Sequence, residues 1–238
     1  MAIHTFTAVV KGVRPLTHDV RELDLALIEP AAIQFKAGQF VSFDVPKAGR
    51  PAPVTRPYSI VSPPSVQDRI TLLLNLVPGG PGSTYLFSLN TGDRTVFKGP
   101  TGAFYLRDEE SRNLLFVATG TGIAPIRSMI ATQLARRTNQ TVTLFWGLRS
   151  QRDLYYQAEF AELARAHSHF SFTTILSRPE PGWTGSTGRV TALVQERVAS
   201  VQNLAVYLCG NGGMIRDVTT LIQGRGLCPI YREKYYDG

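Results

Sequence analysis

The chain has 238 residues, of which 43% are hydrophobic and 18% charged, and its formal net charge is +7. This length accommodates one large domain or two modest ones with a substantial core. No apolar run approaches the roughly 20 residues of a membrane-spanning helix, and the first residues lack the pattern of a secretory signal. A cytoplasmic protein with no membrane contact is therefore expected.

The cysteines and the basic side chains narrow the class of ligand. Cys209 and Cys228 cannot build a disulfide framework or supply the about four ligands of an iron–sulfur cluster, so no metal site is predicted. Residues 111–238 carry 14 of the 25 basic side chains and 8 of the 18 acidic ones. The arginines are scattered rather than gathered in a run, which argues against a nucleic-acid partner and favours a small phosphorylated ligand.

Residues 3–107 have the pattern of short strands separated by Pro, Gly and Asp clusters. Such spacing, with no long helix between the strands, predicts an antiparallel barrel or sandwich. One short helix is expected over 83–90, after a glycine-rich turn. The expected strands cover 5–10, 20–28, 39–45, 56–62, 69–77 and 94–99.

The pattern changes after residues 107–113, where buried apolar runs alternate with amphipathic segments. This alternation predicts a parallel sheet with helices on both faces. The expected strands cover 114–120, 141–147, 170–177 and 204–210, and the expected helices 126–137, 155–167, 190–199 and 213–223. We therefore predict two domains, 1–110 and 111–238.

Two glycine turns have the setting of anion sites. Gly120 and Gly122 follow a buried strand and precede a helix, which is the context of a dinucleotide fingerprint, although Pro125 stands where a third glycine is usual. A second glycine turn, 77–82, leads into Ser83 and the short helix. Either turn could also be merely structural.

Five ordered motifs, RPYS (56–59), GPTGAF (99–104), GTGIAP (120–125), YLCGNGGMIRD (207–217) and YREKYY (231–236), give the chain its family likeness. The whole chain resembles the ferredoxin–NADP reductase superfamily. The resemblance implies an N-terminal antiparallel Greek-key β-barrel that binds flavin. It also implies a C-terminal α/β parallel-sheet domain that binds NAD(P)H.

The resemblance assigns the flavin to the barrel residues. It implies that Arg56, in the Arg56-Pro57-Tyr58-Ser59 motif, binds the pyrophosphate, that Tyr58 lies against the isoalloxazine, and that Ser59 hydrogen-bonds N5. FAD is the expected flavin, with FMN left open. The implied diphosphate residues are Gly82, Ser83 and Thr84.

The resemblance assigns the dinucleotide and the reacting nicotinamide to the second half of the chain. Cys209 and Gly210 would border the nicotinamide, although a free cysteine is commonly a small buried hydrophobe. Glu233 would join the site, and Tyr235 would cover the second flavin face. Tyr231 and Tyr236 compete for that role, and a terminal strand with ordinary packing is the alternative. The implied dinucleotide residues are Gly120, Thr121 and Gly122.

The choice between NADPH and NADH depends on the 2′-phosphate. Ser177 and Arg178 follow the third parallel strand, and Arg216 lies one turn into the last helix. A hydroxyl and two arginines suit a dianion, whereas NADH sites usually present an acidic residue. NADPH is therefore expected, NADH is the alternative, and both arginines could instead be solvated surface charges.

The resulting hypothesis is an FAD-dependent oxidoreductase that moves electrons between NADPH and a one-electron carrier by hydride transfer at flavin N5. Ferredoxin or flavodoxin is the expected partner, since the chain cannot hold an iron–sulfur cluster of its own. A flavin or ferric reductase, an NADH-dependent reductase component of an oxygenase system, and a non-catalytic nucleotide-binding subunit are the rivals. A monomer or weak dimer is expected.

Overall fold

The computed structural model describes residues 3–46, 49, 52–108, 111–136 and 138–236. The chain divides into two compact units, the first formed by 1–106 with 127–132 and the second by 107–126 with 133–238. Since one helix contributes to both units, the predicted domain boundary near residue 110 stays a prediction. In the part of the chain that is described, no helix has the length and apolar character needed to cross a membrane.

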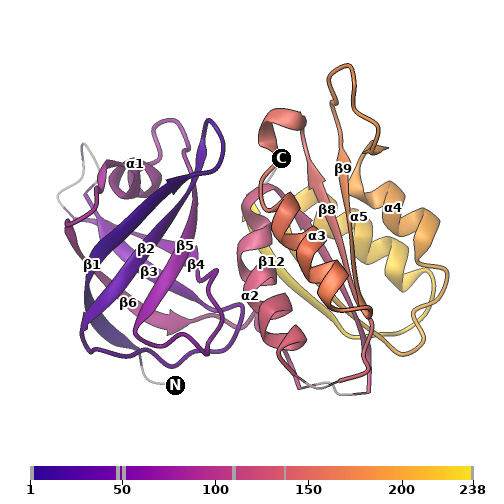
Figure 1. Cartoon of the computed structure of the whole chain (residues 1–238), viewed down its shortest axis with the longest axis horizontal. Coiled ribbons are helices and arrows are strands. Elements are labelled where there is room, and N and C mark those ends of the chain that lie inside the picture. Colours follow the sequence, from indigo (N-terminus) through magenta and orange to yellow (C-terminus); the bar gives the residue numbers. More distant parts are fainter. Residues whose placement is uncertain (1–2, 47–48, 50–51, 109–110, 137, 237–238) are drawn as a thin grey trace. The chain divides into compact units, whose positions relative to one another are not determined.

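The first unit is built on an antiparallel sheet of six described strands (Figure 1). The strand order is β4-β3-β6-β1-β2-β5, and a bridge between Ile60 and Leu72 joins the two outer strands. The last strand, β6, lies between β3 and β1, so the chain crosses over as in a Greek key. The predicted antiparallel barrel is confirmed. The strands are β1 (His4–Pro15), β2 (Val20–Glu29), β3 (Phe40–Val45), β4 (Val54–Ser59), β5 (Arg69–Asn75) and β6 (Arg94–Thr101).

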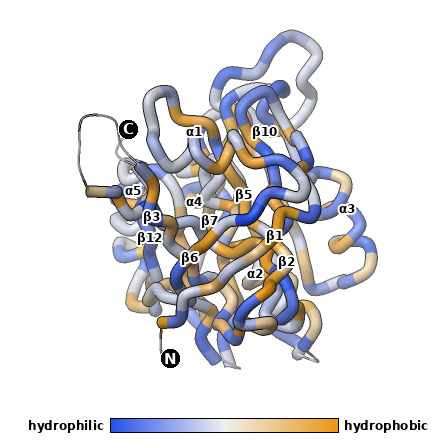
Figure 2. Tube along the Cα trace, turned by 90° about the vertical axis from the view of Figure 1, so that its left-hand side faces the viewer, coloured by the Kyte–Doolittle hydropathy of each residue, from blue (hydrophilic) through white to orange (hydrophobic). Residues whose placement is uncertain are grey.

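Alternating side chains give this sheet a buried face. In β1, Phe6, Ala8 and Val10 are fully or nearly fully buried, and the residues between them are more exposed. The tube in Figure 2 shows the same change between apolar and polar residues along the strands. In the core the Phe97 ring stacks on Phe6, with ring centroids 5.3 Å apart, and packs at a tilt against Phe43, with centroids 5.6 Å apart. The period of two seen in the sequence therefore fills one hydrophobic core.

The short helix α1 (Pro81–Ser88) covers one end of the barrel. Its Leu86 is fully buried, and α1 contacts β3, β4 and β5. Pro81 stands in the first turn, where its missing N–H costs no hydrogen bond. The predicted helix is confirmed, and its first turn faces β4, which carries the RPYS motif.

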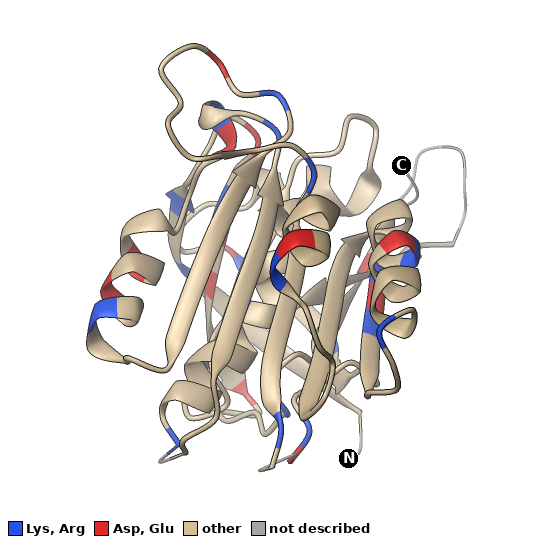
Figure 3. Cartoon of the chain, turned by 90° about the vertical axis from the view of Figure 1, so that its right-hand side faces the viewer, with Lys and Arg blue, Asp and Glu red and all other residues tan. Residues whose placement is uncertain are grey.

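The second unit holds a parallel sheet whose described strands run in the order β10-β9-β8-β7-β11-β12. Its central strands β7 and β11 are almost continuously apolar, as expected when both faces are covered. Figure 3 shows Lys, Arg, Asp and Glu mainly on loops and helices, and β7, β8, β9 and β11 carry none of them, whereas β12 holds Arg232, Glu233 and Lys234. The strands are β7 (Asn113–Thr119), β8 (Val142–Leu148), β9 (Phe170–Leu176), β10 (Ser186–Thr187), β11 (Leu204–Asn211) and β12 (Ile230–Tyr236).

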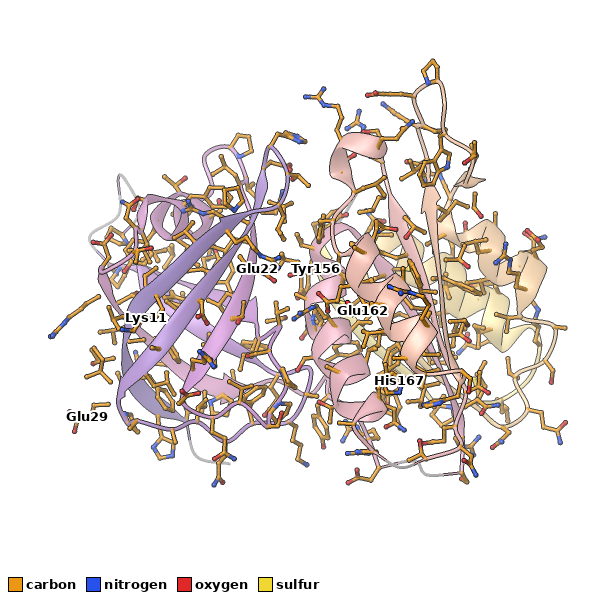
Figure 4. The ribbon with its side chains drawn as sticks, in the orientation of Figure 1. Lys11, Glu22, Glu29, Tyr156, Glu162 and His167 are labelled. Carbon is orange, nitrogen blue, oxygen red and sulfur yellow. The ribbon has the colours of Figure 1, made fainter. Side chains whose placement is uncertain are left out.

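Helices cover both faces of this sheet, as predicted (Figure 1). Leu115 and Val117 pack with residues of α4 and α5 on one face. On the other face the Trp146 ring packs edge-on against Phe160 of α3, with ring centroids 6.0 Å apart. Tyr156, labelled in Figure 4 beside α3, starts that helix in a left-handed conformation, with φ 56°. The helices are α2 (Ile123–Leu134), α3 (Gln157–Ala166), α4 (Val190–Arg197) and α5 (Gly212–Gln223), with short 3₁₀ turns η1 (Gly120–Gly122) and η2 (Gln151–Asp153).

Candidate functional site

Arg56, Tyr58 and Gly82 form a close group in the first unit. A Cβ atom at Gly82 would lie 2.5 Å from the Tyr58 hydroxyl, 2.8 Å from Arg56 Cγ and 2.9 Å from Arg56 Cβ. The first turn of α1 therefore approaches β4 at a distance that admits glycine alone. This arrangement brings a guanidinium, a phenol and the start of a helix together, a combination that suits a diphosphate.

Tyr58 is a neutral hydrogen-bond donor in this group. Burial raises the pKa of its hydroxyl to about 12, and the positive charge of Arg56 opposes that rise without cancelling it. The ring packs edge-on against Phe43, with centroids 5.9 Å apart. At neutral pH the hydroxyl stays protonated, on a ring held by the barrel core.

The neighbouring predicted residues occupy different environments. Ser59 is buried at the end of β4 and Pro57 is exposed. The Ser83 hydroxyl is buried and holds the preceding turn, because it accepts from the Val77 N–H at 3.1 Å and donates to the Gly80 or Val77 carbonyl. Thr84 is exposed. Ser83 thus has a structural task already, and Thr84 is the more accessible hydroxyl of this turn.

In the second unit, the ends of β7 and β11 meet backbone to backbone. A Cβ at Gly122 would collide with the Cys209 carbonyl and lie 2.8 Å from the Gly210 Cα. Gly210, with φ 127°, is equally crowded by Thr119, whose hydroxyl also accepts the Asn211 N–H at 2.9 Å. Gly122 is therefore required by its packing against the end of β11, and Gly210 by its packing against Thr119 of β7, whatever ligand binds nearby.

Gly120 differs from these two glycines. Its φ is 53°, and the nearest atom to a Cβ placed there would be the Tyr236 hydroxyl, at 3.8 Å. Its carbonyl accepts a hydrogen bond from the indole of Trp146 at 3.0 Å, which fixes the turn. Thr121 follows, half-buried, inside η1. Gly120 and Thr121 thus leave room beside the start of α2, where a dinucleotide phosphate would approach.

Cys209, Glu233 and Tyr235 lie close together, while the catalytic roles predicted for them stay predictions. Cys209 pairs with Glu233 across the parallel β11–β12 ladder, and Tyr235, at an irregularity in that ladder, hydrogen-bonds the Cys209 thiol. Cys209 is fully buried. Burial raises the pKa of its thiol well above the ordinary value, the Glu233 carboxylate raises it further, and a hydrogen bond with Tyr235 opposes both. The thiol is therefore a buried neutral group that is hydrogen-bonded to Tyr235.

This burial predicts a difference between the two cysteines. In the native protein we expect a maleimide to modify half-buried Cys228 well before buried, protonated Cys209, because the thiolate is the reactive form. Peptide mass mapping after timed labelling measures both rates. Equal labelling of the two thiols in the unchanged protein would contradict the buried position of Cys209.

The other terminal tyrosines have separate contacts. Tyr231 packs on Tyr207 with centroids 4.8 Å apart, and the Arg107 guanidinium lies 5.3 Å from the Tyr231 ring. Tyr231 is thus part of the sheet packing, whereas Tyr235 and Tyr236 are exposed. The interpretation of these residues as a terminal strand is confirmed, since β12 pairs with β11 in parallel, and the role of Tyr235 as a flavin cover stays a prediction.

Ser177 and Arg178 are exposed and follow β9. The Arg178 N–H donates to the Arg149 carbonyl at 2.7 Å, so Arg149, the exposed residue after β8, lies directly beside it. Sequence reasoning missed Arg149, although it occupies the same position after its strand as the Ser177–Arg178 pair. Arg216 is exposed on α5, and its guanidinium lies near Gly213. In the strand order β9-β8-β7-β11, Arg216 follows a strand three places from β9.

Comparisons with known proteins agree with this architecture. Residues 7–105 match the family model of the oxidoreductase FAD-binding domain, and residues 116–220 match that of the oxidoreductase NAD-binding domain. The chain is 35% identical to ferredoxin–NADP reductase B of Sorangium cellulosum, over 97% of each chain. It is 32% identical to the reductase component of phenol 2-monooxygenase from a Pseudomonas species, over 98% of this chain and 66% of that one.

A solved structure shows the same fold. A cytochrome reductase from Amycolatopsis superposes with a TM-score of 0.88 at 30% identity, over 99% of this chain and 71% of that one. The chain therefore spans about two thirds of these larger reductases and nearly all of the Sorangium protein. By its two domain matches and this identity, the chain belongs to the ferredoxin–NADP reductase superfamily and is an oxidoreductase with FAD and NAD(P)H as cofactors.

Proposed function

We propose that this oxidoreductase takes electrons from NADPH and delivers them singly to a small redox carrier of the ferredoxin or flavodoxin type. One observation carries the choice of NADPH: Arg149 and Arg178 lie side by side at the ends of β8 and β9. Neither guanidinium has a hydrogen-bond or ion-pair partner among the described residues. Two unneutralised guanidinium groups suit the dianionic 2′-phosphate that distinguishes NADPH from NADH.

The first unit would hold the FAD. The close group of Arg56, Tyr58 and Gly82 fits a flavin diphosphate, because guanidinium and helix amides meet at a position without a Cβ. Thr84 adds an exposed hydroxyl at the same turn. Ser59, buried at the end of β4, is the proposed hydrogen-bond partner of the flavin ring. FAD, when bound, supplies the conversion of hydride transfer into single-electron transfer.

The second unit would orient the coenzyme. Gly120 and Thr121 would receive the diphosphate at the start of α2, where the backbone leaves room. The nicotinamide would lie at the end of β11, beside Cys209 and Gly210, after Tyr235 has moved away from the thiol. Glu233 would hold a carboxylate near the reacting ring. The role of Arg216 in phosphate binding stays a prediction, because Arg216 lies on α5, which follows β11, and β11 is three places from β9 in the sheet.

A reductase component of an oxygenase system is the second candidate. The 32% identity to the phenol 2-monooxygenase reductase component favours it. The chain spans 66% of that protein, so the comparison bears on the shared region alone. In this alternative NADH would be the coenzyme, and the acceptor would be a partner component of the same system.

Steady-state turnover tests both candidates. Purified protein should be yellow, release FAD on denaturation, and oxidise NADPH faster than NADH with a ferredoxin or flavodoxin as acceptor. Free FMN and ferricyanide serve as comparison acceptors. A protein that refuses flavin would reject the whole assignment. Faster turnover with free flavin than with every carrier would favour a flavin reductase, and an NADH preference would favour the oxygenase reductase component.

A further inference from the structure

We propose that Gln151 is a positioning residue for coenzyme selectivity. Its side-chain amide ties the loop after β9 to the loop after β8, so that Arg149 and Arg178 are presented to the ligand as a pair. This proposal rests on the proposed reading of the 2′-phosphate by these arginines. Gln151 itself is not expected to touch the phosphate.

The tie consists of two hydrogen bonds to one peptide segment. Gln151 Nε2 donates to the Glu180 carbonyl at 2.8 Å, and the Glu180 N–H donates to Gln151 Oε1 at 2.8 Å. The side-chain amide thus makes the pair of hydrogen bonds to Glu180 that the backbone of a neighbouring strand would otherwise make. It continues a ladder that begins with the Ser177 N–H to the Leu148 carbonyl at 3.0 Å.

The two loops that Gln151 joins are each folded on themselves. In the loop after β8, the Asp153 carboxylate accepts from the Ser150 N–H at 2.8 Å and from the Ser150 hydroxyl at 3.0 Å. In the loop after β9, the Trp183 indole donates to the Ser186 carbonyl at 3.0 Å. Backbone bonds join the two loops at Ser177 and Arg178, and the two bonds of Gln151 fix a second point of attachment at Glu180, so that the loops cannot turn about the first.

The charges at this edge make such a tie necessary. Arg149, Arg152 and Arg178 are exposed, and in the described parts of the chain none of their guanidinium groups has a hydrogen-bond or ion-pair partner. The backbones of Arg149 and Arg178 are hydrogen-bonded to each other, and the repulsion between their like charges works against this pairing. Hydrogen bonds from the uncharged Gln151 hold the loops together without neutralising the arginines. The 2′-phosphate of NADPH would then bind to arginines that are already in place, and binding would cost less conformational entropy because the two loops need not be ordered.

The test substitutes Gln151→Met, which keeps the length of the side chain and removes both hydrogen bonds. We expect kcat/KM for NADPH to fall about five- to tenfold through KM, as two exposed hydrogen bonds allow, with kcat unchanged. NADH kinetics should stay within about twofold, because NADH lacks the group that the arginine pair would bind. Inhibition by 2′-AMP should weaken, and inhibition by 5′-AMP should not.

Two further variants interpret the result. Gln202→Met removes an exposed glutamine that precedes the amino end of β11, whereas the arginines follow the carboxyl ends of β8 and β9. This control should leave the kinetics with both coenzymes unchanged. Arg178→Ala reports on the coenzyme site itself. If it removes the NADPH preference while Gln151→Met leaves that preference intact, Gln151 has no positioning role. If Arg178→Ala leaves the preference for NADPH unchanged, the proposed binding of the 2′-phosphate by these arginines is itself wrong, and the role of Gln151 that depends on it is rejected with it. Equal losses with both coenzymes, or a lower unfolding temperature, would make Gln151 a stability residue and overturn the proposal.

Discussion

Gly82→Ala is expected to yield protein that is largely free of flavin. The added Cβ would lie 2.8 Å from Arg56 Cγ and 2.9 Å from Arg56 Cβ; Cγ can move only by rotating the side chain, which displaces the guanidinium, and Cβ cannot withdraw without moving β4 or α1. Displacing the guanidinium would remove the charge-assisted hydrogen bonds to FAD that we propose for Arg56, of about 1.5–3 kcal/mol, which corresponds to roughly ten- to hundredfold weaker FAD binding. The absorbance of bound flavin per protein and an FAD titration measure the loss.

A matched control separates flavin binding from general damage. Gly12→Ala adds the same methyl group in β1, where the nearest atom would be Asp24 Cβ at an ordinary 3.9 Å, and it should retain its flavin. Arg56→Ala removes the guanidinium without adding any atom and should lose flavin as Gly82→Ala does. If Arg56→Ala and Gly82→Ala both retain their full FAD content, the cofactor binds elsewhere.

The fold was largely predictable from the sequence because its periods are simple. Alternation in residues such as Phe6, Ala8 and Val10 predicts a half-buried antiparallel sheet, and that sheet is found. Continuous apolar runs such as 114–119 predict parallel strands covered on both faces, which is also observed. The terminal strand β12 was open to two interpretations, since its mixed polar and aromatic residues lie at a sheet edge where no strict alternation is imposed.

The candidate site was predictable where neighbouring residues in sequence are also neighbours in space. The Arg56–Tyr58 pair is such a case, because i and i+2 share a strand face. The relation between Arg149 and Arg178 was not predictable, because it depends on the pairing of β8 with β9 and on the register beyond their ends. The same holds for Gly82, whose proximity to Arg56 arises from tertiary packing of α1. Gln151 carries no motif at all, and only its two hydrogen bonds identify it.

Replacing both Arg149 and Arg178 with alanine is expected to remove the preference for NADPH. We expect kcat/KM for NADPH to fall about a hundredfold, since the two proposed charge-assisted contacts to the 2′-phosphate would be lost, and kcat/KM for NADH to change by less than about threefold. Because both side chains are exposed and lack partners among the described residues, their removal should leave the unfolding temperature unchanged. Steady-state kinetics with each coenzyme, at constant ionic strength, give the ratio.

Single variants show which arginines form the phosphate site. Arg165→Ala removes an exposed charge from the last turn of α3 and should have no effect on either coenzyme, which controls for the overall positive field of the second unit. Arg216→Ala tests the residue that the sequence paired with Arg178. Strand order places β11 three positions from β9, about 14 Å at the usual strand spacing, so Arg216→Ala should cost far less NADPH preference than Arg149→Ala. The reverse ranking would mean that the phosphate binds at the end of β11, and the pairing of Arg149 with Arg178 would then have no part in coenzyme choice.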